Sequence, residues 1–164
     1  MKNLKLVLVF VMLFANGCVF KKNHSNSNSE GSSIALYNYP LDKFIEPKTD
    51  ELKLILKDFH FDYNSSKINN NQKPLLTSIA NWLKETTGTL HILIEGHCDE
   101  RGNNEYNLVL GEQRALAIRH FLINAGIDDI RIQTISYGEE RSINLDHNET
   151  AWKKNRRGHF LIAG

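Results

Sequence analysis

The chain has 164 residues, a net charge of +1 and charged side chains at 24% of its positions, as expected of a single globular domain with short accessory segments. Nothing in this balance indicates the clustered basic surface of a nucleic-acid-binding protein, so we expect no nucleic-acid partner. The aliphatic residues after position 50 are sufficient for one core of modest size.

The N-terminus has the pattern of a targeting segment. Lys2 and Lys5 precede an unbroken apolar run from Leu6 to Ala15. This run is shorter than the roughly 20 residues that a membrane span requires, so residues 1–17 are predicted to be a secretory signal peptide. The alternative is an uncleaved anchor that extends to Phe20.

The two cysteines of the chain, Cys18 and Cys98, do not form a plausible disulfide framework, because one follows the apolar run and the other lies in the domain. The segment 15–18 resembles a lipobox, in which the cysteine thiol carries a diacylglycerol and the signal is cut before it, although Ala15 and Asn16 depart from the usual pattern. We therefore expect Cys18 to be lipidated and to anchor the protein through membrane lipid.

Residues 18–50 are predicted to be the lipidated N-terminus and a flexible linker, ahead of a domain at 51–164. Residues 21–33 are polar and small, without apolar periodicity. Residues 34–50, with Pro40 and Pro47, either drape on the domain or stay loose. A flexible stretch of about 30 residues spans roughly 30 Å.

The apolar pattern of the domain predicts alternating strands and helices. Strands are expected at 54–61, 90–95, 130–137 and 158–163, and helices around 76–83 and 115–125. Pro74 suits the first turn of the first helix, and Gly88 and Gly126 suit the two helix ends. The order βαβαββ predicts an α/β fold, a two-layer α+β sandwich.

The most informative segment is an acidic loop directly after an apolar strand, followed by a helix with an early arginine. Asp99 lies just past the strand end, where loops collect binding groups, and Arg114 lies early in the helix. A carboxylate accepts from an ammonium and a guanidinium binds a carboxylate, so the two residues suit a zwitterionic ligand group. The alternative is a structural ion pair between loop and helix.

Several separated motifs resemble one known family in the same order along the chain. They are residues 59–62, 95–102, 106–108, 111–115, 136–141, 147–149 and 154–157. They resemble the OmpA-like peptidoglycan-binding domain and, in detail, the peptidoglycan-associated lipoprotein (Pal) family, over residues 54–163. The resemblance implies a mixed sheet with both helices on one face.

The resemblance also implies a binding site for the meso-diaminopimelate of the peptidoglycan stem peptide. Asp99 and Arg114 match the residues that hold its ammonium and carboxylate. Weaker matches to the same site are Phe61, Asp62, Asn107, Leu110, Asn155 and Arg157. Asn155 and Arg157 are expected either to line the site or to brace it. For Asn107 and Leu110 the alternative roles are a helix cap and a packing residue. The chain departs from the family at Cys98, Gln113 and residues 103–104.

The function implied is to tether the outer membrane to peptidoglycan without a covalent bond to the wall. The protein would be anchored in the outer membrane, face the periplasm and belong to the Tol–Pal system, with the TolB-type propeller as a partner. Val19 after the lipidated cysteine favours outer-membrane sorting in that system. The alternatives are another OmpA-like wall-binding protein, or an enzyme that uses Glu95 and Asp99. A metal site at His97, Cys98 and Asp99 is disfavoured, because adjacent strand residues point to opposite faces. We expect no catalytic residues, metal or cofactor.

Overall fold

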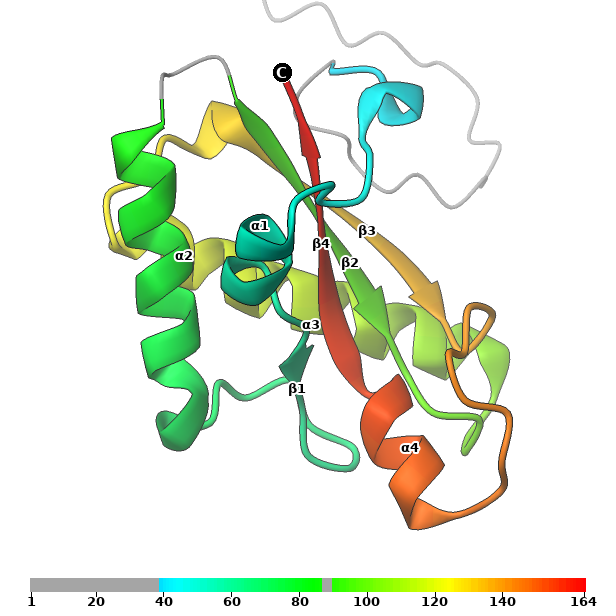
Figure 1. The fold of residues 1–164 in the computed structure, drawn as a ribbon. Coiled ribbons are helices and arrows are strands. Elements are labelled where there is room, and N and C mark those ends of the chain that lie inside the picture. The colour runs from blue at the N-terminus through cyan, green and yellow to red at the C-terminus, as the bar shows by residue number, and fades with distance from the viewer. Residues whose placement is uncertain (1–38, 87–89) are drawn as a thin grey trace, which may run out of the picture. The chain divides into compact units, whose positions relative to one another are not determined.

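The computed structural model describes residues 39–86 and 90–164 (Figure 1). The predicted signal peptide, Cys18, most of the linker and Gly88 lie outside these residues. No helix within the described residues is long and apolar enough to span a membrane.

The centre of the domain is a mixed four-stranded sheet of order β1-β4-β2-β3. The strands are β1 Phe59–His60, β2 His91–His97, β3 Ile132–Gly138 and β4 Arg157–Ala163. β2 and β3 run parallel, whereas β4 pairs antiparallel with both β2 and β1. The predicted mixed sheet is therefore confirmed.

Four α-helices accompany the sheet: α1 Asp50–Ile55, α2 Lys73–Glu85, α3 Asn104–Asn124 and α4 Glu149–Asn155, with 3-10 turns at Leu41–Lys43, Asn70–Gln72 and Asp129–Arg131. The predicted helices correspond to α2, which has a proline in its first turn, and α3, which ends before Gly126 at φ 95°. Helix α3 begins at Asn104, well before the expected start, so Arg114 lies in the middle of the helix rather than early in it.

Two short helices correct the predicted order. The strand expected from residue 54 is instead helix α1, and only Phe59 and His60 pair as a strand. The hydroxyl of Thr49 accepts from the backbone N–H of Leu52 and caps α1. Helix α4 was not predicted; the side chain of Asn148 caps it by accepting from the backbone N–H of Ala151. In both helices the sequence signal is a capping side chain at the N-terminus rather than an apolar period.

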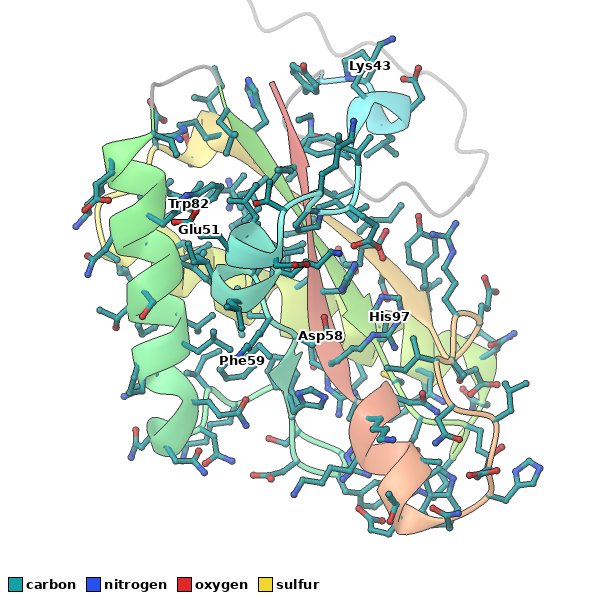
Figure 2. All side chains as sticks on the ribbon, viewed as in Figure 1. Lys43, Glu51, Asp58, Phe59, Trp82 and His97 are labelled. Carbon is teal, nitrogen blue, oxygen red and sulfur yellow. The ribbon has the colours of Figure 1, made fainter. Side chains whose placement is uncertain are left out.

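The main core lies between one face of the sheet and helices α2 and α3. Its fully buried members come from every strand and from both helices: Phe59, Leu76, Ile79, Leu83, Ile92, Ile94, Ala115, Ile118, Leu122, Ile132 and Phe160. In Figure 2, Phe59 lies between β1 and α2.

The other face of the sheet is partly covered by residues 39–45. Phe44 and Tyr39 pack near Leu93 of β2, and Ile45 exchanges two backbone hydrogen bonds with Ile162 of β4, at 2.9 and 3.0 Å. Contacts of the domain therefore extend N-terminal of residue 51, and this part of segment 34–50 drapes on the sheet.

Candidate functional site

A cavity of about 280 Å³ opens where β2 ends and α3 begins. Among the predicted site residues, Asp99, Asn107, Leu110 and Arg114 line it. The loop after β1, the loop after β2, the first turns of α3 and the end of α4 all contribute to its wall.

Two glycines bring α3 onto β2 and so set the position of the cavity. A Cβ at Gly96 would lie 1.8 Å from the carbonyl oxygen of Gly111, and a Cβ at Gly111 would lie 2.3 Å from the hydroxyl of Ser136. The strand and helix backbones therefore approach each other more closely than any side chain allows. Arg114, one turn further along α3, is held against the end of β2.

Asp99 is 3% exposed, and its carboxylate is bound by two arginines. Its Oδ1 accepts from the backbone N–H and the Nε of Arg101, each at 3.1 Å. Its Oδ2 accepts from Nη2 of Arg101 at 2.7 Å and from Nη1 of Arg156 at 3.0 Å. Burial alone raises the pKa of Asp99, but these hydrogen bonds outweigh it and hold the pKa below its usual value.

Arg114 is fully buried and donates to backbone carbonyls from two loops. Its Nε donates to Ser65 at 2.9 Å, its Nη2 to Asp62 at 3.1 Å and its Nη1 to His97 at 2.8 Å. Nη1 also contacts the sulfur of Cys98 at 3.3 Å. Burial lowers the pKa of this guanidinium from its ordinary value.

The structural ion pair considered from the sequence does not form among the described residues. The partners of Asp99 are Arg101 and Arg156, and the partners of Arg114 are carbonyls and one sulfur. Asp99 and Arg114 thus line one cavity as separate charges of opposite sign, each with protein partners of its own.

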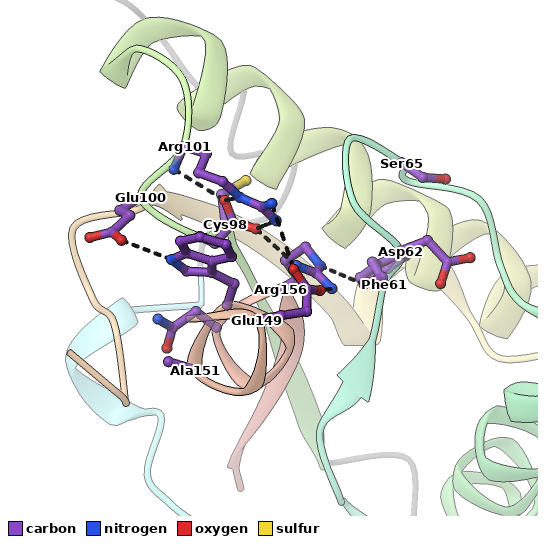
Figure 3. A network of polar contacts seen from close by, with 12 residues as sticks. Phe61, Asp62, Ser65, Cys98, Glu100, Arg101, Glu149, Ala151 and Arg156 are labelled. Atoms are coloured by element: carbon purple, nitrogen blue, oxygen red, sulfur yellow. Dashed lines mark hydrogen bonds and ion pairs between the residues drawn. The ribbon is translucent and has the colours of Figure 1, made fainter. Parts of the chain in front are cut away.

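Arg101, Arg156 and Glu149 complete the site, and the sequence reasoning missed them (Figure 3). Arg156 donates to the carbonyl of Phe61 at 3.1 Å, to Asp99 and to Glu149 at 2.7 Å. The guanidinium carbon of Arg101 lies 4.0 Å from the ring centre of Tyr63. The hydrogen bond to Asp99 raises the pKa of Arg101.

The other predicted residues near the cavity act mainly through shape and backbone. Asn107 donates to the carbonyls of Asp99 and Arg101, so it fixes the loop after β2 rather than capping α3, a role that Asn103 fills. The ring of Phe61 lies 5.3 Å from the guanidinium of Arg114. Asp62 offers its carbonyl to Arg114, while its carboxylate accepts from Asn69.

Asn155 and Arg157 do not line the cavity. The side-chain oxygen of Asn155 accepts from the backbone N–H groups of Ile143 and Asn144, which braces the loop before α4. Arg157 lies 3.4 Å from Asp58. The neighbouring Arg156 reaches Asp99 instead, because the two successive residues diverge where α4 passes into β4.

Two further groups considered from the sequence have local partners. The thiol of Cys98 is buried, donates to the carbonyl of Asn107, and has its pKa raised by burial to about 11. Glu95 contacts His97 at 3.3 Å and is not part of the cavity wall. The arrangement therefore supports binding of a charged ligand rather than general acid–base chemistry between Glu95 and Asp99.

Comparisons with known proteins agree on one family. A sequence model of the OmpA family matches residues 60–156. The peptidoglycan-associated lipoprotein of Brucella melitensis is 36% identical over 161 residues, covering 96% of this chain and 90% of that protein. That of Pseudomonas aeruginosa is 32% identical over 154 residues, covering 92% and 90%.

Solved structures show the same fold. The crystal structure of the peptidoglycan-associated lipoprotein from Burkholderia pseudomallei has a TM-score of 0.62 and 38% identity, covering 64% of this chain and 88% of that chain. The C-terminal domain of Helicobacter pylori MotB has a TM-score of 0.63 at 22% identity, covering 66% and 84%, which is a likeness of fold.

Proposed function

This chain belongs to the OmpA family and, within it, to the peptidoglycan-associated lipoproteins, and we propose that it binds the stem peptide of peptidoglycan without chemical turnover. The observation that carries this proposal is that Asp99 and Arg114, of opposite charge, line one cavity. The side-chain end of meso-diaminopimelate has an ammonium and a carboxylate, so it is complementary to such a cavity.

In the proposed complex the ligand ammonium binds the carboxylate of Asp99, and the ligand carboxylate binds the guanidinium of Arg114. Both protein charges are nearly excluded from water, which strengthens an ionic contact with a ligand group that fits between them. Asn107 and Leu110 shape the wall from α3. Phe61 and Asp62 support Arg114. Asn155 and Arg157 brace the loop before α4 through residues 141–144.

We propose that lipidated Cys18 anchors this domain in the outer membrane, facing the periplasm, so that the protein tethers the membrane to the wall. Val19 after that cysteine favours this sorting. As a member of the Tol–Pal system the protein would support envelope integrity and membrane invagination during division, and its partner would be a TolB-type propeller. Co-purification of that propeller from native envelopes separates this role from that of a wall-binding lipoprotein outside the system.

The binding proposal is best tested by changing the ligand and leaving the protein unaltered. The full chain in detergent is bound to sacculi and displaced with soluble muropeptides that carry diaminopimelate, amidated diaminopimelate or lysine. The muropeptides with amidated diaminopimelate and with lysine lack the side-chain carboxylate that Arg114 is proposed to bind. Loss of a desolvated charged partner costs on the order of 2–5 kcal/mol, or roughly thirtyfold or more in affinity. Equal displacement by all three muropeptides would refute the site assignment.

A further inference from the structure

The carboxylate of Asp99 has no free acceptor position in this structure. A carboxylate offers about four lone-pair sites on its two oxygens. Arg101 supplies three hydrogen bonds, from its backbone N–H, Nε and Nη2, and Arg156 supplies the fourth. A ligand ammonium that binds Asp99 must therefore replace one of these donors.

Of the two arginines, Arg101 is the one that can move. Its side chain is 28% exposed, against 6% for Arg156. Arg156 is also tied to the carbonyl of Phe61, which fixes it to the loop after β1. The Arg101 side chain has no backbone acceptor among the described residues, so its guanidinium can leave while its backbone N–H stays in place.

A second position for the guanidinium is already adjacent. Nη1 of Arg101 lies 3.6 Å from Oε2 of Glu149, a carboxylate on α4 that is 62% exposed. The rings of Tyr63 and Trp152 lie 4.0 and 4.1 Å from its guanidinium carbon, and cation–π contacts tolerate small shifts along a ring face. Arg101 can therefore turn from Asp99 to Glu149 without losing its aromatic contacts.

We propose that Arg101 is a resident cation that occupies the ammonium site of the empty cavity and moves to Glu149 when the ligand binds. The inference rests on the proposed binding of diaminopimelate and adds a residue that determines specificity. Only a ligand cation that binds Asp99 better than Arg101 does gains entry, so the resident cation excludes neutral and anionic groups from this carboxylate.

The opposite role would be a brace, in which Arg101 holds Asp99 in position for the ligand. The two roles predict changes of opposite sign when the guanidinium is removed. Arg101→Gln keeps the backbone hydrogen bond to Asp99 and removes the competing charge. Under the proposal, the affinity for a diaminopimelate muropeptide rises by about threefold or more, because the ligand ammonium no longer competes for Asp99 with the partly exposed guanidinium of Arg101.

Arg141→Gln is the matched control. Arg141 also stacks on an aromatic ring, 3.6 Å from the centre of Tyr137, and also lies near a carboxylate, 3.7 Å from Glu95, but it is outside the cavity wall. Calorimetry on the full chain in detergent, with circular dichroism to check folding, should show no change in affinity for this variant.

A chemically modified ligand gives a second, independent comparison. A muropeptide whose diaminopimelate ammonium is acetylated has no cation to exchange with Arg101, so wild type and Arg101→Gln should bind it equally. Binding by Arg101→Gln that is equal to or weaker than wild type with the unmodified muropeptide would overturn the inference and leave the proposed function standing. Failure of the wild-type protein to bind the unmodified muropeptide would overturn both the inference and the proposed function.

A spectroscopic test uses the wild-type protein alone, so it does not depend on a variant that folds. The Nε–H groups of Arg101 and Arg156 both donate to protein oxygens, and such groups can be followed by side-chain NMR. On saturation with the diaminopimelate muropeptide, the Arg101 signal should shift and exchange faster with solvent, whereas that of Arg156 stays protected. An Arg101 signal that is unchanged at saturation would refute the exchange.

Discussion

The four contacts of Arg114 predict that this residue stabilises the fold as well as the proposed site. Arg114→Met keeps an unbranched apolar side chain beside Phe61 but leaves the carbonyls of Asp62, Ser65 and His97 without this donor. An unsatisfied buried acceptor costs about 1–3 kcal/mol. The carbonyls of Asp62 and Ser65 are only partly buried and can bind water, so the buried carbonyl of His97 should contribute most. We expect the free energy of unfolding to fall by about 3–5 kcal/mol in total.

This loss is a large part of the roughly 5–15 kcal/mol that stabilises a typical domain. Urea unfolding followed by circular dichroism measures it, with Arg141→Met as a control that should lose no more than about 1 kcal/mol, because the side chain of Arg141 is 57% exposed and its contact with Glu95 is long, at 3.7 Å. A loss below about 1 kcal/mol for Arg114→Met would show that the three carbonyls find other donors. If the large loss is observed, binding by Arg114 variants must be compared only where each variant is folded.

Three other changes have definite expected outcomes. Gly111→Ala should lower the free energy of unfolding by about 1–3 kcal/mol, because its Cβ would lie 2.3 Å from the hydroxyl of Ser136. Adding Ser136→Ala to this variant should restore part of the loss. Burial lowers the pKa of His159, but Asp58 and Glu46 outweigh it and raise the pKa to about 9. His159 therefore stabilises the fold fully below its unfolded pKa of 6.5. The free energy of unfolding, measured relative to His159→Gln, should fall by on the order of 3 kcal/mol as pH rises from there through about 9. Cys18→Ala should abolish incorporation of labelled palmitate; continued incorporation would refute the lipobox.

The sequence predicted those features that depend on a continuous local pattern. Apolar residues at helical spacing predicted α2 and the C-terminal half of α3, and the position of Asp99 after an apolar strand predicted its place in the wall of a cavity. Helices α1 and α4 have six and seven residues, which is too short for an apolar period to be evident. The local signals available were the cap residues, Thr49 before α1 and Asn148 before α4.

The partners of the site could not be predicted in the same way, because they come from distant segments. Arg156 reaches Asp99 across 57 positions of sequence, and Arg114 reaches Ser65 across 49. Between Arg156 and Arg157, two neighbours of the same type, only the geometry at the end of α4 decides which one enters the cavity. The sequence pattern predicted an arginine from this segment at the site, namely Arg157, whereas the neighbouring Arg156 lines the cavity.

Under the proposed exchange, the contacts between Arg101 and Asp99 also weaken the intrinsic affinity of the cavity, because a ligand ammonium must replace Arg101 rather than bind an empty carboxylate. A tether offsets such a weakness. If Cys18 is anchored in a membrane, about 20 residues separate it from the segment that packs on the sheet, and a flexible linker of that length has an r.m.s. span of roughly 25 Å. Wall peptides within that reach meet the domain at a high effective concentration. Many weak contacts of this kind, each able to open and close, would hold the membrane to the wall and still let individual domains release during constriction.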